Sequence, residues 1–189
     1  LDASFLPPQA SHMIYRFLLP VLVASSLIPF AVAEENWPQF RGPNAQGSLP
    51  QAHPPTVFGL DQSVAWKTAI SSGIGSPVVW GERIFLTGLE GGTLHMLCLS
   101  RSDGKLIWKK EVPAGQLETV HQKSNPASAT PATDGQRVVG WFPSLGLMAW
   151  DMEGKEVWRK PMEMPFVVNG SGTSPVIAGS KVILNCDQQ

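Results

Sequence analysis

Two short patterns recur along this chain, and their spacing constrains the fold more than any other feature of the sequence. The first begins with a small residue and Pro, continues through a short apolar stretch to a Gly turn, and ends in a second apolar stretch. Its copies occupy residues 76–86, 130–139 and 174–184, with the Gly four positions after the Pro each time. Apolar runs on both sides of a Gly turn are typical of antiparallel hairpins, so the sequence predicts three of them.

The second pattern is centred on tryptophan. At Trp66, Trp108 and Trp158 an acidic residue lies five positions earlier and a basic residue directly follows. In the later two copies Gly104 and Gly154 come directly after the acidic residue, which favours a turn into the next strand. A large flat side chain at a repeated position can wedge between neighbouring repeat units. We therefore predict that these tryptophans and glycines dock the units together; the alternative is a row of tryptophans that stacks on a ligand.

The distances between repeats are those of propeller blades. Pro77, Pro131 and Pro175 lie 54 and 44 residues apart, and blades of four strands recur at such intervals. The predicted fold class is all-β, a β-propeller sector of about two and a half four-stranded antiparallel blades from a ring of roughly seven or eight. The predicted propeller repeats span residues 63–189. Their parts are a ring-closing strand at 63–68, blades at 76–112 and 130–160, and a partial blade at 174–189.

The last repeat stops after its second strand, and the strand at 63–68 has no earlier strands of its own unit. We therefore expect the chain to be part of a longer ring. In that case the 63–68 strand lacks its intended sheet or pairs with the nearest blade.

Before the repeats, the sequence predicts three segments that carry no blade. Residues 1–12 show no usable pattern and are an upstream segment of unknown origin. Residues 13–33 have a short positive start, an uncharged apolar run at 17–30 and a small-residue end at Ala33, the layout of a secretory signal peptide. A membrane anchor or a buried helix is the alternative, but a span takes about 20 residues. Residues 34–62 are an extended lead-in rich in Pro and Gly. We expect export to the periplasm or medium, with no membrane span after cleavage.

The repeats resemble a known family. Residues 97–108 and 148–158 are similar to the motif A-L-D-x-x-T-G-K-x-x-W of the pyrroloquinoline-quinone-like (PQQ-like) β-propeller repeat, with Ser102 and Met152 in place of the Thr. Ser100 also replaces the first Asp of the motif. The segments 36–44 and 121–131 resemble exported propellers of this kind as well. The resemblance implies the fold, but the same blades serve enzymes and scaffolds.

An enzyme of this family would bind PQQ with Ca²⁺ in the central channel and use an Asp as base. This sequence has no adjacent Cys pair, no carboxylate cluster suited to a hard cation and no His-x₃₋₅-His spacing. Cys98 and Cys186 are far apart, and we expect two free, buried thiols because a blade separates them. We therefore predict no catalytic residue, no metal site and no cofactor, with PQQ and Ca²⁺ only under the enzyme alternative.

The candidate ligand residues lie in loops that lead to or follow first hairpins. His121, Lys123 and Asn125 precede the second blade, and Asp187 follows the last hairpin. Such loops border the channel mouth of a propeller; the alternative is ordinary polarity of exposed turns. With a net charge of −1, the chain lacks the excess of basic residues that binding to nucleic acid requires.

Two functions remain. The first is an exported, non-catalytic scaffold that binds a protein or polysaccharide. Some relatives are outer-membrane assembly lipoproteins, although no Cys stands directly after Ala33 here to carry a lipid. The second is a fragment of a PQQ-dependent dehydrogenase.

Overall fold

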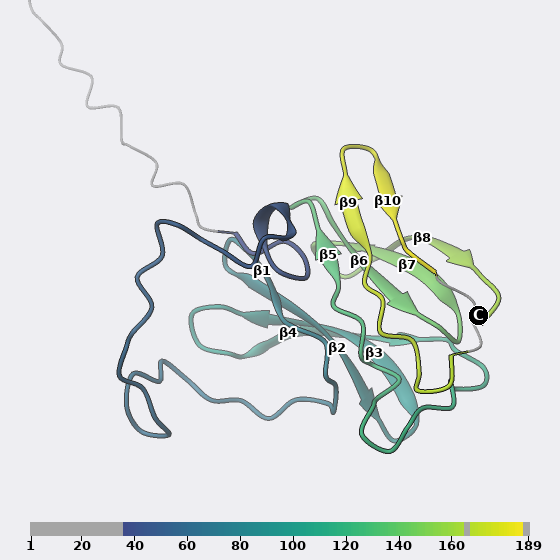
Figure 1. Ribbon diagram of the computed structural model, residues 1–189, viewed down its shortest axis with the longest axis horizontal. Helices are drawn as coiled ribbons and strands as arrows, with labels where there is room; N and C mark the ends of the chain where they lie inside the picture. The colour runs from purple at the N-terminus through teal and green to yellow at the C-terminus, as the bar shows by residue number, and fades with distance from the viewer. Residues whose placement is uncertain (1–35, 165–166, 187–189) are drawn as a thin grey trace, which may run out of the picture. The chain divides into compact units, whose positions relative to one another are not determined.

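The computed structural model describes residues 36–164 and 167–186, so the predicted upstream segment, the signal peptide and Asp187 lie outside the described residues. One short 3₁₀ turn, η1 (Pro43–Ala45), precedes the strands. The first sheet has the order β1-β2-β3-β4 (Figure 1). Its strands are β1 (Val78–Trp80), β2 (Arg83–Glu90), β3 (Thr93–Ser100) and β4 (Leu106–Val112).

The second sheet repeats this order and is followed by a lone hairpin. Every neighbouring pair of strands is antiparallel. The first strands of consecutive sheets are neighbours, since β1 contacts β5 and β5 contacts β9. This confirms the predicted fold class: four-stranded antiparallel propeller blades and the first hairpin of another. The remaining strands are β5 (Ala132–Thr133), β6 (Arg137–Phe142), β7 (Gly146–Asp151), β8 (Glu156–Pro161), β9 (Val176–Ala178) and β10 (Lys181–Ile183).

Short acidic turns set where these strands begin and end. The Oδ1 atom of Asp134 accepts the backbone N–H groups of Gln136 and Arg137, each at 2.9 Å. In the same way, Oδ1 of Asp151 accepts the N–H of Lys155 at 2.8 Å. A carboxylate that pairs with N–H groups a few residues ahead favours a tight turn over continued extension. The aspartates therefore end one strand and start the next.

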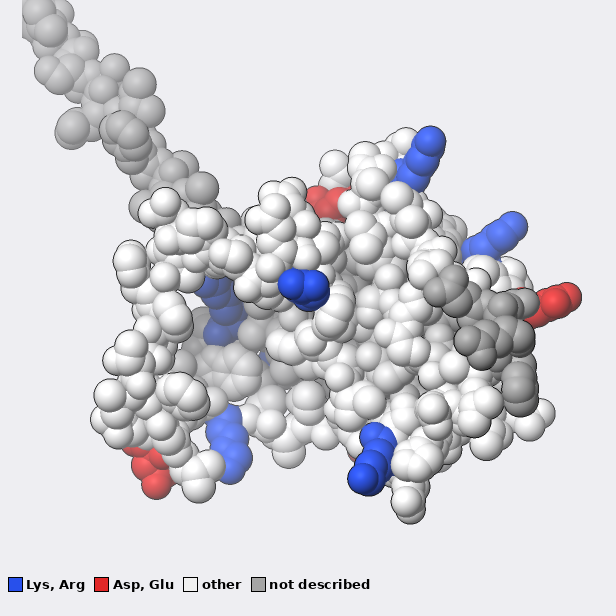
Figure 2. Space-filling model, viewed as in Figure 1, with Lys and Arg blue, Asp and Glu red and all other residues white. Residues whose placement is uncertain are grey.

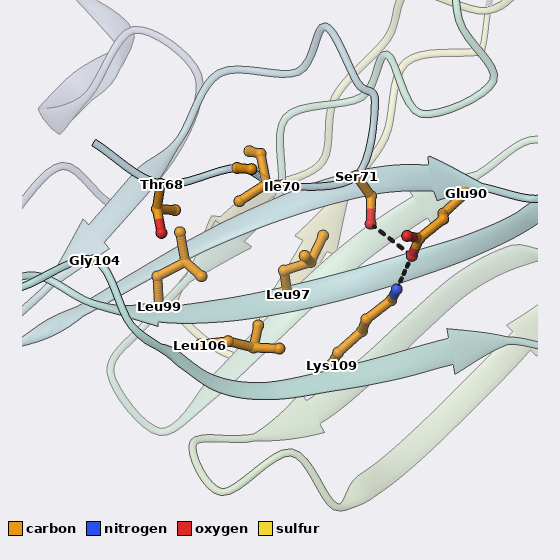
Figure 3. A pocket seen from close by; sticks show the side chains of 10 residues that line it. Thr68, Ile70, Ser71, Glu90, Leu97, Leu99, Gly104, Leu106 and Lys109 are labelled. Carbon is orange, nitrogen blue, oxygen red and sulfur yellow. Dashed lines mark hydrogen bonds and ion pairs between the residues drawn. The ribbon is translucent and has the colours of Figure 1, made fainter.

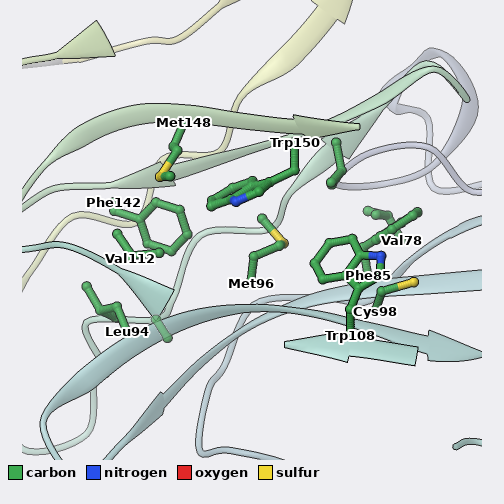
Figure 4. Close-up of a cluster of buried hydrophobic side chains, with 12 residues drawn as sticks. Val78, Phe85, Leu94, Met96, Cys98, Trp108, Val112, Phe142, Met148 and Trp150 are labelled. Atoms are coloured by element: carbon green, nitrogen blue, oxygen red, sulfur yellow. The ribbon is translucent and has the colours of Figure 1, made fainter. Parts of the chain in front are cut away.

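The side chains between the two complete blades form one apolar core (Figure 4). Alternate residues of a strand point to opposite faces of its sheet, and here one face of each blade supplies this core. From the first blade come Phe85, Met96, Cys98 and Trp108, and from the second come Phe142, Met148 and Trp150. The ring centroids of Phe85 and Trp108 are 5.8 Å apart.

The second blade is buried on its other face as well. Val139, Trp141 and Leu147 form a second cluster, against which Ile177 and Val182 of the β9–β10 hairpin pack. A sheet covered on both faces reads as an unbroken apolar run rather than an alternating one. This explains why β6 and β7 carry charges only at their outer ends, Arg137 and Asp151, and it is the arrangement expected of stacked blades.

Two predictions about the lead-in need correction. Residues 63–68 form no strand: the chain there is irregular, and the isolated bridges on either side of it join Gly59 to Gln62 and Ser72 to Leu89. A single strand has no stable ladder without its own sheet, and no such sheet lies among the described residues. The segment 34–62 is also more than extended chain, because it contains η1 and pairs with β1 through Trp37.

The two thiols differ in exposure. Both are free, as predicted, and Cys98 is buried on β3, but Cys186 is exposed. The prediction of a buried Cys186 was wrong because this residue lies beyond the end of β10, outside the cluster that the hairpin helps to form. Burial raises the pKa of the Cys98 thiol to about 12.

We expect one thiol of the native protein to react with a maleimide at pH 7.5 and two to react after denaturation. The reason is that the reactive thiolate is both inaccessible and absent at Cys98. Mass spectrometry of the labelled peptides checks this. Rapid labelling of Cys98 in the native protein would show that the core between the blades is open.

Candidate functional site

Three connecting segments meet at one end of the blades, and we call them the loop face: residues 68–77, 113–131 and 167–175. Each leads into the first strand of a sheet, β1, β5 or β9. They are joined to each other by hydrogen bonds, as described below. The turns that follow β1 and β5 lie at the opposite end of these strands, which we call the turn end.

The structure places the predicted ligand residues on the loop face in different roles. His121 and Lys123 are exposed, and Nδ1 of His121 accepts the N–H of Lys123 at 3.2 Å. Asn125 is half-buried, and its amide joins two segments: Nδ2 donates to Oγ of Ser72 at 3.1 Å and Oδ1 accepts the N–H of Ala127 at 2.8 Å. The first two side chains are therefore available to a ligand, whereas Asn125 holds the loops in place.

A buried serine joins the other two segments. The carbonyl of Ser171 accepts Oγ–H of Ser128 at 2.7 Å, and its Oγ accepts the indole N–H of Trp141 at 3.2 Å. Its own N–H donates to Oε1 of Glu118 at 2.6 Å. No sequence pattern predicts this cluster. Ser171 lies in a Gly-Ser-Gly segment that predicts only a turn, and no sequence signal distinguishes Glu118 from an exposed loop residue.

Glu118 is a buried carboxyl with one unsatisfied oxygen. The residue is 6% exposed, and Oε2 has no hydrogen-bond partner among the described residues. Burial raises the pKa of this carboxyl, although the hydrogen bond from Ser171 opposes the shift. The folded state therefore holds the proton more tightly than the unfolded state, and ionisation costs stability.

We expect Glu118→Gln to raise the melting temperature at pH 8 and to leave it unchanged at acid pH. Glutamine keeps an oxygen for the Ser171 N–H but carries no charge. Stability of the wild-type protein falls as the pH rises from the usual glutamate pKa of 4.5 through the raised value in the fold. The gap between the two proteins should open over that interval in thermal melts. The same change at exposed Glu163 serves as control, and a variant less stable than wild type at pH 8 would contradict the assignment.

A line of hydroxyls ties the first strands together where the loop face enters them. The N–H of Ser76 donates to Oγ1 of Thr130 at 2.9 Å, and the N–H of Thr130 donates to Oγ of Ser174 at 3.0 Å. These are the small residues that precede Pro in the three hairpin repeats. Ser76 and Thr130 therefore each give their N–H to the hydroxyl of the equivalent residue in the next repeat, so the repeat fixes the spacing of the blades.

The predicted docking residues lie away from the loop face. Trp108 of the first blade lies on the turn that joins β7 to β8, where its indole N–H donates to the Met152 carbonyl at 2.9 Å. A Cβ added at Gly154 would lie 2.8 Å from the ring. Arg83 also donates to the Met152 carbonyl and pairs with Glu153 at 3.2 Å.

The same geometry occurs one repeat earlier. The indole N–H of Trp66 donates to the Arg101 carbonyl at 2.8 Å, and a Cβ at Gly104 would lie 2.3 Å from that ring. Trp66 thus occupies its repeat position although no strand forms around it. Trp158 is half-exposed and packs beside the β9–β10 hairpin. That docking by these side chains stabilises the protein stays a prediction, which the substitutions in the Discussion test.

Between residues 68–71 and the first blade lies a pocket of about 230 Å³ (Figure 3). Its floor is apolar, with Leu97, Leu99 and Leu106, and Ile70 approaches from the covering segment. Glu90 pairs with Lys109 at one end, and this pairing lowers the pKa of the Glu90 carboxyl. The pocket offers an apolar floor with one neutralised charge pair, which suits packing against another apolar surface.

Over residues 36–164 and 167–186, no three His, Cys, Asp or Glu side chains gather where they could hold a metal ion. The same residues include no helix long and apolar enough to cross a membrane.

Comparison with known proteins agrees with the repeat pattern. Residues 50–188 match the family described as outer membrane protein assembly factor BamB. Among solved structures, BamB from Moraxella catarrhalis is similar at 17% identity with a TM-score of 0.48. The alignment covers 65% of this chain and 37% of that one, so this chain spans little more than a third of that protein. No curated protein matches. Because the family match covers most of the sequence, the chain belongs to the family of the outer membrane protein assembly factor BamB, with PQQ-like propeller repeats.

Proposed function

We propose that the chain is the blade-bearing part of an exported, non-catalytic scaffold that binds a protein through its loop face. The observation that carries the proposal is the bracing of this face. Asn125, Ser128 and Glu118 of one loop hold the segments on either side through hydrogen bonds to Ser72 and Ser171. Loops fixed before binding lose less conformational entropy when a partner arrives, so the bracing favours recognition by a preformed surface.

The exposed residues of the loop face suit a protein better than a polysaccharide. Val168 is 78% exposed, and its neighbour Asn169 accepts the N–H of His121 at 3.5 Å. An exposed apolar side chain beside His121 and Lys123 is the mixture found in protein interfaces. Residues 68–77, 113–131 and 167–175 of the loop face include no Phe, Tyr or Trp on which a sugar ring could stack. Membership of a family described as an assembly factor supports a protein partner as well.

The distribution of charge supports the same partner class. On the face shown in Figure 2, the Lys and Arg side chains lie apart and form no continuous basic patch. Binding to nucleic acid needs several cations placed along a phosphate backbone. The proposal therefore includes no nucleic acid, and it includes no quinone cofactor.

Site-specific photo-crosslinking tests the loop face. A benzophenone amino acid is placed at Lys123, at Val168 or, as control, at Lys105 in the turn between β3 and β4, where the side chain is 83% exposed. In cells that export the protein, we expect irradiation to give a discrete protein adduct from the first two positions and none from the third. Adducts from all three positions alike, or from Lys105 alone, would contradict the proposal.

A further inference from the structure

The first described residues of the chain lie along the free edge of β1. The N–H of Trp37 donates to the Val79 carbonyl, and the N–H of Val79 donates to the Trp37 carbonyl, both at 2.8 Å. This is an antiparallel bridge. Just beyond it, the side-chain oxygen of Asn36 accepts the N–H of Gly81 at 2.8 Å. Residues 36–37 thus pair with β1 on its side away from β2 and add to the edge of the first sheet.

The same segment also reaches the second blade. The carbonyl of Pro38 accepts the N–H of Thr133, the last residue of β5, at 2.8 Å. Proline has no N–H to leave unpaired, so it is tolerated at an edge of a sheet. Three consecutive residues, 36–38, therefore pair with the first strands of two neighbouring blades.

A turn behind this segment keeps its tryptophan in place. Gly42 has φ +67°, and a Cβ added there would lie 2.5 Å from the Trp37 ring. The N–H of Gly42 donates to the Gln39 carbonyl at 2.9 Å, and the N–H of Gly47 donates to the Arg41 carbonyl at 2.6 Å. Residues 36–47 fold back on themselves, and we call this segment the clip.

We infer that the free edges of β1 and β5 form a binding site for an extended peptide, that the clip is its built-in occupant, and that an Asn-Trp-Pro peptide binds there in trans. The site has a backbone donor and acceptor at Val79, a donor at Thr133 and the Gly81 N–H for a side-chain amide. Pro38 of the occupant has no N–H and therefore needs no acceptor. Backbone pairing of an extended segment with a sheet edge is a common mode of peptide recognition.

The clip shields the edges of two strands from other chains. Exposed strand edges invite pairing with other chains, and the clip covers the edges of β1 and β5 at the turn end. It lies at the opposite end of these strands from the loop face, because it bonds to Gly81 in the turn after β1 and to Thr133, the last residue of β5. Its occupancy is therefore independent of what the loop face binds, and failure of one proposal leaves the other standing.

Hydrogen exchange with a peptide supplied in trans tests the inference. The chain lacking residues 36–47 is compared with the full chain, and a synthetic peptide of sequence 36–47 is then added. We expect the amides of Val79 and Thr133 to be protected in the full chain, to lose protection in the shortened chain and to regain it with the peptide. A peptide with Trp37→Ala should restore nothing, and the amide of Met96 in the central strand β3 should stay protected throughout.

A second variant decides the matter if the shortened chain does not fold. In the full chain, Gly42→Val pushes the Trp37 ring away and should expose the same two amides. Gly59→Val is the control, because a Cβ at Gly59 meets no atom within 4 Å. Protection of Val79 and Thr133 that persists in Gly42→Val, or a folded shortened chain that the peptide leaves unchanged, overturns the inference.

Discussion

Replacing Trp108 with Ala should lower the free energy of unfolding by about 3–5 kcal/mol, the usual cost of truncating a large buried aromatic side chain. The side chain is 8% exposed, packs against Phe85 and donates a hydrogen bond to the Met152 carbonyl. Its loss leaves a cavity between the blades and removes one of the two hydrogen bonds to the Met152 carbonyl, to which Arg83 still donates. Denaturant unfolding of the full chain followed by circular dichroism measures the effect.

Trp158→Ala provides the matched control. The residue holds the same position in its repeat, but it is half-exposed and donates no hydrogen bond among the described residues. Its loss should cost clearly less than the loss of Trp108. If Trp108→Ala left stability nearly unchanged and weakened ligand binding instead, the tryptophans would be a stacking row rather than docking groups.

Gly154→Ala should also be strongly destabilising. The residue has φ +82°, and its new Cβ would lie 2.7 Å from Cε of Lys110 and 2.8 Å from the Trp108 ring. Left-handed backbone costs a residue with a Cβ about 1–2 kcal/mol. Overpacking against the ring adds roughly 1–3 kcal/mol. The same unfolding measurement gives the sum.

Gly91→Ala separates the two costs. Gly91 also has a positive φ, +57°, but a Cβ there meets no atom within 4 Å, so only the backbone cost applies. Equal destabilisation by the two substitutions would mean that the Trp108 ring yields freely, and that the contact between tryptophan and glycine does not fix the blades.

The sequence was sufficient for the blades because their signals are local. A Gly turn between apolar runs and an acidic residue beside it specify a hairpin whatever lies around it, so the bounds of the two blades follow closely from the repeats. The register of Trp66, Trp108, Gly104 and Gly154 likewise follows from the repeat, since equivalent residues face equivalent neighbours.

Other features of the fold and of the site depend on contacts between distant residues, which no local sequence pattern specifies. Whether residues 63–68 form a strand depends on a sheet to pair with, and whether residues 36–38 pair depends on a free edge at β1. The tie between Glu118 and Ser171 joins loops 53 residues apart. A lone Glu in a polar loop gives no sign of burial. Nor does the sequence indicate that the amide of Asn125 braces the loops; that this residue binds a ligand stays a prediction.

If the protein is a binding scaffold without quinone chemistry, titration of the exported protein with PQQ and Ca²⁺ should show it. Calorimetry and absorbance follow binding, and reduction of an artificial electron acceptor in the presence of alcohols follows turnover. We expect no saturable binding of PQQ and no reduction of the acceptor dye. Stoichiometric binding of the quinone with Ca²⁺-dependent dye reduction would contradict it and would identify the protein as a quinoprotein dehydrogenase.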